Sequence, residues 1–510
     1  MSPPDVRPAL VTMVGVLVTW YAAWPIERAA GLHLDVVVLA TVLALTLARV
    51  ISRERAWGGG RLVARAVALP LVALAATEVG RLIADHRWLG GAVFCLVLAL
   101  AVWVRRFGRA WTVLGSLVAL PFVSLLVVPV PVGPDTARSL WPAAMALLAF
   151  AVVGAVHLLA WRTGFVDPPL HAPSPQRPTT RRLPASTRMA VQLLVGLAAS
   201  YAVGRWLFPD HWPWLVLSCY VVCSGNRGRG DVLHKGVLRL AGALVGTASA
   251  TLLAGAFPAG DRTAIVLLFV VMALAQWLRP LSYAYWAGGV TAMLALLHGY
   301  FGIGGTGELG DRLLGVALGA VVAVAVSWCL LPVRSNDVFR RRWADALAAL
   351  SGLLTALRER PHDAATERAA FATAAGQVEQ LEPAYRFHRR TLHQLLAPHA
   401  DAHPADLATL LRSVRDALAA VGPERLGDHR ATLVAWARQV GGVRRRMRGE
   451  PGGPTRAAAA GDAAVDEVSE ALALLDAAFT PAVWQRLGGA PPAPPAPSGA
   501  DEAEETVRGG

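Results

Sequence analysis

Charged residues are scarce in this sequence. Only 16% of the 510 residues are charged, whereas 55% are apolar and the mean hydropathy is +0.46. A water-soluble protein of this length rarely shows this balance. The charge is also uneven, because the first 333 residues contain long uncharged runs while the segment after them is rich in arginine and carboxylates. We therefore expect lipid to surround the first two-thirds of the chain and water to surround the rest.

Groups that hold a metal or a nucleotide are missing as well. The four cysteines lie inside apolar runs without the cysteine and histidine spacing of a zinc site. Lys235 is the only lysine, and no phosphate-binding glycine loop precedes it. Gly302, Gly304 and Gly307 have dinucleotide-fingerprint spacing, but they lie between two expected spanning helices rather than after a strand. We expect no metal, no cofactor, no ATP hydrolysis and no catalytic constellation, so the chain is not expected to be an enzyme.

Long apolar runs are what the sequence does contain. A spanning helix needs about 20 mostly apolar residues. Such runs predict about twelve spans, near 9–24, 33–50, 63–82, 88–104, 111–131, 140–161, 188–207, 212–224, 236–256, 263–278, 282–300 and 312–332. We thus expect an all-α, multi-pass protein of the inner or plasma membrane.

The basic residues predict how these spans are oriented. Lysine and arginine are retained on the cytoplasmic side of a membrane. With the N-terminus inside, the inner loops hold many more arginines than the outer loops, so both termini are expected in the cytoplasm. The net charge of +13 is then explained by orientation, and it does not indicate a nucleic-acid partner.

The two sets of six spans have similar arginine spacing. Arg65 begins the third span and Arg138 precedes the sixth, while Arg239 and Arg312 occupy the same places 174 positions later. Because six is an even number, the two halves would share one orientation and be related by a pseudo-two-fold axis along the membrane normal. Paired repeats commonly frame a transport path at their interface.

Amphipathic helical periodicity follows the last span. Apolar residues recur at helical spacing after Pro332, which predicts a cytosolic helical bundle followed by a disordered tail rich in proline and alanine. The expected regions are a first six-helix half at 1–161, a cytosolic connector at 162–187, a second half at 188–333, a cytosolic helical domain at 334–487 and a tail at 488–510.

The strongest local pattern lies in the second half. A short span with Trp212 and Trp214 is followed by an inner loop of glycine and basic residues, and then by a helix with Arg239, Gly242 and Gly246. This stretch resembles the fusaric acid resistance family, also called the aromatic acid exporter family, whose members have an Arg-x-x-Gly-Thr-x-x-Gly helix. Ala243 stands here in place of the threonine. Glycines at these spacings, together with Gly315 and Gly319 of a second family-like stretch, also allow close helix packing.

The resemblance implies export of small organic anions, often aromatic carboxylates. Arginine can bind a carboxylate through two hydrogen bonds while aromatic faces contact its ring. The implied substrate path has charge from Arg239 and Arg205, aromatic contacts from Trp214, Tyr220 and Trp286, and a hydrogen bond from Thr291. The unusually short eighth span is a further pointer to a binding site, whereas an arginine at a membrane edge can also be a lipid anchor.

The energy source and the partners stay open at this point. Glu78 and His298 are candidates for proton coupling, although Glu78 lies one turn from Arg81 and a local ion pair explains it as well. The expected partners are the lipid bilayer and a small organic anion, with a homo-oligomer left open. Two alternatives to an exporter remain: a passive anion channel, and a membrane scaffold whose cytosolic bundle recruits another protein.

Overall fold

The computed structural model describes residues 5–30, 35–52, 59–126, 140–167, 184–254, 258, 260–300, 308–393, 403–450, 452–457 and 459–488. Every regular element within these ranges is helical, so the expected all-α class is confirmed for this part of the chain. Residues 168–183 of the expected connector, Arg138 and the tail after Gly488 lie outside the described residues. Contacts divide the chain into two compact units, a membrane unit before Arg334 and a C-terminal unit from Arg334 onward.

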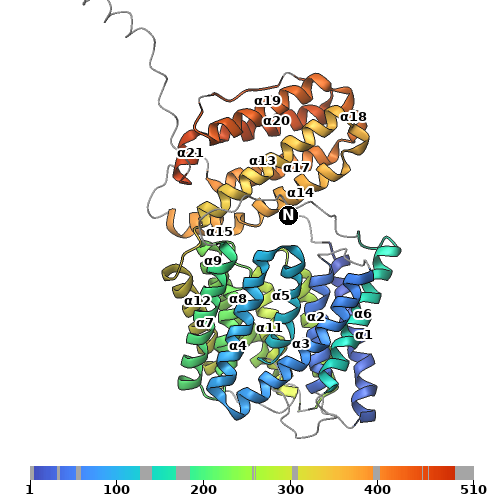
Figure 1. Cartoon of the computed structure of the whole chain (residues 1–510), viewed down its shortest axis with the longest axis vertical. Coiled ribbons are helices and arrows are strands. Elements are labelled where there is room, and N and C mark those ends of the chain that lie inside the picture. Colours follow the sequence, from blue (N-terminus) through green and yellow to red (C-terminus); the bar gives the residue numbers. More distant parts are fainter. Residues whose placement is uncertain are drawn as a thin grey trace, which may run out of the picture. The chain divides into compact units, whose positions relative to one another are not determined.

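The membrane unit consists of packed helices (Figure 1). Among the described residues, six stretches are long and apolar enough to cross a bilayer. They lie in α1 (Arg7–Ala30), α3 (Gly59–Asp85), α4 (Arg87–Trp103) with η1 (Val104–Phe107), α6 (Trp141–Arg162), α7 (Ala185–Leu207) and α12 (Glu308–Cys329).

Shorter helices complete this unit. The shorter apolar ones are α2 (Asp35–Ile51), α5 (Arg109–Ser124), α8 (Trp212–Cys223), α10 (Arg262–Leu278) and α11 (Tyr283–Tyr300). The remaining helix, α9 (Arg229–Ala254), begins with a charged turn in which Lys235 pairs with Asp231 at 2.8 Å. The helix composition identifies a multi-pass membrane protein.

Apolar side chains on the outside of this unit indicate a lipid solvent. On α3, Val63, Val67 and Leu71 are all exposed and follow one another at a spacing of four residues. Such a stripe would be unfavourable in water but suits contact with acyl chains. Thr41 is buried, and its hydroxyl donates to the Val37 carbonyl of its own helix at 2.8 Å, so this hydroxyl is satisfied in an apolar setting.

Helices at corresponding places in the two halves have corresponding neighbours. α1, α2 and α6 pack together, and so do α7, α8 and α12. α3 contacts α5 and α6, just as α9 contacts α11 and α12, and the pair α4 and α5 has its counterpart in α10 and α11. The contacts between the halves also correspond, because α4 packs against α7 and α10 packs against α1.

Two glycine contacts follow the same correspondence. Gly115 of α5 lies so close to Ala101 of α4 that no Cβ would fit, and Gly289 of α11 lies equally close to Ala275 of α10. Gly289 and Ala275 stand 174 positions after Gly115 and Ala101 respectively. This is the same offset that separates Arg65 from Arg239.

The end of α12 is capped by a buried glutamine of α7. Gln192 is 1% exposed and donates to the carbonyl oxygens of Leu330 at 2.8 Å and Leu331 at 3.2 Å. The last carbonyls of a helix have no partner within the helix, so a buried end needs such a donor. Gln192 therefore fixes the point at which the chain leaves the membrane unit.

The C-terminal unit is a helical bundle with an aromatic and leucine-rich core. Its helices are α13 (Ser335–Glu359), α14 (Ala365–Glu379), α15 (Glu382–His388), α17 (Pro404–Ala420), α18 (Pro423–Asp428), α19 (Arg430–Met447), α20 (Ala463–Ala478) and α21 (Pro481–Arg486). Trp343 lies fully buried between Phe339 and Phe479, and both rings stack on it. Leu474 is the one exposed large apolar side chain among the described residues from Arg334 onward, so this surface suits water.

Candidate functional site

Close packing of α9 on α11 buries Arg239. A Cβ on Gly242 would come within 2.5 Å of the Ala284 carbonyl oxygen, and Gly246 is in equally close contact with Gly288. The missing side chains let the two helix backbones approach each other. Arg239, one turn before Gly242, is thereby enclosed and only 2% exposed.

A second glycine pair brings α12 against α8 and positions another arginine. Gly315 lies against Trp214 and Leu215, and Gly319 lies against Leu215 and Ser218. Arg312, near the start of α12, is 6% exposed, and its Cζ lies 4.0 Å from the centre of the Trp214 ring. Its Nη2 donates to the Thr291 carbonyl oxygen at 2.7 Å.

These two residues form what we call the buried arginine pair, Arg239 and Arg312. Arg312 lies within reach of the charge of Arg239. Within the described part of the chain, no carboxylate pairs with either one, and the Nε of each has no hydrogen-bond acceptor. A buried cation without a counter-charge is unfavourable by several kcal/mol, which makes the pair the candidate anion-binding group among the described side chains.

Of the other residues expected on the path, Thr291 contacts this pair, whereas Tyr220 and Trp286 have other neighbours. The Thr291 hydroxyl donates to the Ala287 carbonyl oxygen at 2.9 Å, so it is the backbone carbonyl of Thr291, not its hydroxyl, that binds Arg312. Tyr220 lies at the C-terminal end of α8 and packs on the core shared by α4, α7 and α8. Trp286, near the start of α11, lies instead under Arg49.

Arg205 is not brought into contact with the buried arginine pair. It lies at the C-terminal end of α7, where its Nε donates to the Tyr201 hydroxyl at 3.3 Å. Its Cζ lies 5.0 Å from the centre of the Trp212 ring. These contacts give Arg205 an aromatic setting of its own.

The two candidates for proton coupling have different outcomes. Glu78 is 62% exposed along its side chain and forms a salt bridge with Arg81 at 2.8 Å, the local pair that the spacing suggested. His298 falls on α11, but its side chain lies outside the described ones. Glu78 is thus a surface group on α3, where an ion pair contributes little to stability.

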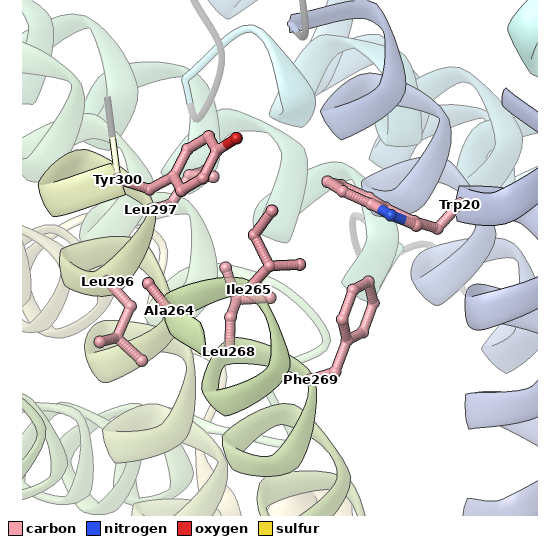
Figure 2. A pocket seen from close by; sticks show the side chains of 8 residues that line it. All are labelled: Trp20, Ala264, Ile265, Leu268, Phe269, Leu296, Leu297 and Tyr300. Carbon is pink, nitrogen blue, oxygen red and sulfur yellow. The ribbon is translucent and has the colours of Figure 1, made fainter. Parts of the chain in front are cut away.

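A small apolar pocket lies between the two halves (Figure 2). Its lining comes from α1, α10 and α11 and comprises Trp20, Ala264, Ile265, Leu268, Phe269, Leu296, Leu297 and Tyr300. Trp20 and Phe269 meet edge to face with ring centres 5.4 Å apart. No charged side chain lines the pocket, so it offers no counter-charge to a carboxylate.

Sequence reasoning missed four residues of this region as site candidates. Arg312 had a signal, because it follows Arg239 at the same interval at which Arg138 follows Arg65. Tyr283 had one as well, because it begins the second family-like stretch, whereas Arg49 and Arg279 had none, since an arginine at the end of a span is also the ordinary membrane anchor.

Residues 197–326 match the family model described as fusaric acid resistance protein-like. The resemblance seen in the sequence is therefore confirmed over this segment, which includes α8 to α11 and all of the buried arginine pair. No curated protein matches the chain.

Proposed function

We propose that this chain, whose residues 197–326 form a fusaric acid resistance protein-like domain, exports small organic anions, with aromatic carboxylates as the main class. The observation that carries the proposal is the buried arginine pair. Two guanidiniums enclosed by lipid-facing helices without a carboxylate partner among the described residues favour an anion that arrives from outside the protein. An aromatic carboxylate suits the site because Trp214 adds an aromatic surface beside Arg312.

The proposed architecture has twelve spans in two parallel six-helix repeats. The spans occupy 1–161 and 188–333, both termini are cytoplasmic, and residues 334–487 form a cytosolic domain. Support comes from the corresponding helix contacts in the two halves and from the matching contacts of Gly115 and Gly289. The substrate path then runs along the interface of the repeats, with the buried arginine pair at its side.

The test compares Arg239 with its counterpart in the first half. Purified full-length protein is reconstituted into liposomes, and efflux of radiolabelled benzoate and butyrate is measured with and without a pH gradient. Arg239→Gln should reduce benzoate efflux about tenfold or more, since a hydrogen bond to a charged group contributes roughly 1.5–3 kcal/mol. Arg65→Gln is the matched control, because Arg65 lies 174 positions earlier on α3 but is only partly buried.

Three outcomes separate the alternatives. Equal efflux by the Arg239→Gln and Arg65→Gln proteins would remove Arg239 from the path. Efflux that persists without any pH gradient would favour a passive channel. If the wild-type protein carries neither anion in liposomes, and deletion of residues 334–510 still abolishes the resistance of cells to a toxic aromatic acid, the scaffold alternative is the correct one.

A further inference from the structure

A second group of cationic and aromatic side chains lies where the two halves meet. We call it the inner cluster; its members are Arg49, Gln276, Arg279, Tyr283 and Trp286. Arg49, near the end of α2, places its Cζ 3.7 Å from the centre of the Trp286 ring, and its Nη2 donates to Gln276 Oε1 at 3.3 Å. Arg279, at the end of α10, lies 5.6 Å from the same ring centre. The first half thus contributes one arginine and the second half everything else.

Tyr283 gives this cluster an unused hydrogen-bond donor. Its hydroxyl is buried, and no described group accepts from it or donates to it. Arg239, Arg279 and Arg49 all act electrostatically on this hydroxyl. A buried donor left without an acceptor costs about 1–3 kcal/mol, and positive charge on several sides favours an acceptor that is negative.

The Trp286 ring does not offer a ligand a free face to stack on. A guanidinium already covers one face of Trp286 at 3.7 Å, and a second guanidinium lies close to the ring. What the cluster presents to a ligand is therefore positive charge and one hydroxyl donor. This combination recognises a carboxylate and does not discriminate between aromatic and aliphatic ones.

We propose that the inner cluster is a capture site for carboxylate anions, which take up the Tyr283 donor and then pass to Arg239 and Arg312. The inference rests on the proposed export function and adds a first binding step at the face of the membrane where α2 ends. Arg239 lies near both sites: it stands one turn before Gly242, which packs against Ala284 next to Tyr283, and its charge reaches Arg312. Because Arg49 lies on α2 and the other members lie on α10 and α11, both halves contribute to the capture site.

The experiment measures flux from each face separately. Inside-out and right-side-out membrane vesicles are loaded with radiolabelled benzoate or butyrate from the exterior. For Arg49→Gln we expect the half-saturating concentration to rise about tenfold when the anion is added at the α2 C-terminal face, with a nearly unchanged maximal rate. The increase should be equal for benzoate and butyrate, and flux from the opposite face should not change.

Two further variants control for structure. Arg106→Gln removes an exposed arginine that lies 5.1 Å from the Trp103 and Phe107 ring centres on its own segment, so it should behave as wild type. Arg49→Lys keeps the charge but loses the planar group, and an intermediate half-saturating concentration is expected. The inference is overturned if Arg49→Gln matches Arg106→Gln, or if it lowers the maximal rate equally from both faces, which would make Arg49 only a contact between the halves.

A binding measurement separates this inference from the proposed function. Benzoate that binds the folded protein raises its thermal unfolding midpoint in detergent. If the Arg49→Gln protein needs about tenfold more benzoate than wild type for the same stabilisation, the capture site stands even when no flux is found, and only the export function is wrong. If both proteins are stabilised equally at every benzoate concentration, the capture site is wrong although the export function can stand.

Discussion

Buried arginines occur in both units of this protein, but their neighbours differ. In the C-terminal unit, Arg446 is 4% exposed, and its Nη2 donates to both the carboxylate and the carbonyl oxygen of Asp476. In the membrane unit, Arg239 and Arg312 are equally enclosed, and no described carboxylate pairs with them. The structural arginine Arg446 thus carries its counter-charge in the fold, whereas the buried arginine pair has none among the described side chains, as the proposed anion site requires.

The largest expected loss of stability comes from breaking the buried ion pair of Arg446 with Asp476. Asp476→Ala leaves the Arg446 charge buried and also removes the acceptor of the Thr455 amide, which donates to Asp476 Oδ2 at 2.7 Å. Removing one partner of a buried ion pair costs about 3–5 kcal/mol. We expect a large drop in the unfolding temperature of the C-terminal unit, measured on the full chain in detergent.

The control for this prediction is an exposed pair in the same unit. Glu450 accepts from Arg448 Nε at 2.6 Å, and both side chains are largely in solvent. Glu450→Ala should leave the unfolding temperature nearly unchanged, since exposed pairs contribute little. A shift as large as that of Asp476→Ala would show that burial is not what distinguishes the two pairs.

The next largest effect concerns function and not stability. Arg312→Gln removes a buried cation but keeps a side-chain amide that can still donate to the Thr291 carbonyl. We expect benzoate efflux to fall about tenfold or more, while the unfolding temperature stays the same or rises because an uncompensated charge is gone. Efflux from liposomes and thermal unfolding of the same preparation measure both.

A loss of stability in the Arg312→Gln protein would reverse this interpretation. If the variant unfolds as easily as Asp476→Ala does, Arg312 is a structural residue that holds α12 against α11. The comparison between the two units would then no longer separate structural from functional arginines.

The sequence was informative about lipid exposure and helix packing. Its apolar runs predicted the long spans, and Gly242 and Gly246 stood at a spacing that the structure uses against Gly288. Lipid exposure and glycine packing can be predicted from a short stretch of sequence, because both depend on the residues along one face of a single helix. The short α8 also pointed to the neighbourhood in which Trp214 meets Arg312.

The partners of the arginines could not be predicted in the same way. Arg312 bonds to a backbone carbonyl 21 residues away, and Arg49 bonds to Gln276 across 227 residues. Nothing local in the sequence encodes such pairings, because they depend on how helices of the two halves meet. For the same reason Arg205, chosen for its charge, lies with Tyr201 and Trp212 instead of with Arg239.

The ion pair of Arg425 with Asp462 is intermediate between these cases, because the Arg425 side chain is 60% exposed and that of Asp462 only 15%. At the start of α20, the Asp462 carboxylate accepts from Arg425 Nε at 2.6 Å and from Arg425 Nη2 at 2.9 Å. It also caps the helix by accepting from the Ala464 amide at 3.0 Å. The hydrogen bonds from Arg425 lower the pKa of the Asp462 carboxyl below its ordinary value.

The smallest expected effect follows from that lowered pKa. Because the unfolded chain binds a proton at Asp462 more readily than the folded one, the pair's stabilising contribution is fully present above the ordinary aspartate pKa of about 4. It is lost as the pH falls through that value toward the lower pKa of the folded state. Asp462→Asn keeps a capping oxygen but not the charge, so it should lower the unfolding temperature of the C-terminal unit slightly at pH 6, and wild type should approach the variant as the pH falls toward 3. The full chain can unfold in more than one step, and the step whose midpoint Asp476→Ala shifts is the unfolding of the C-terminal unit, which is the one to measure here. A difference that stays constant from pH 6 to pH 3 would mean that the pairing of Arg425 with Asp462 adds nothing beyond the helix cap, and that only buried arginines of this protein depend on a counter-charge.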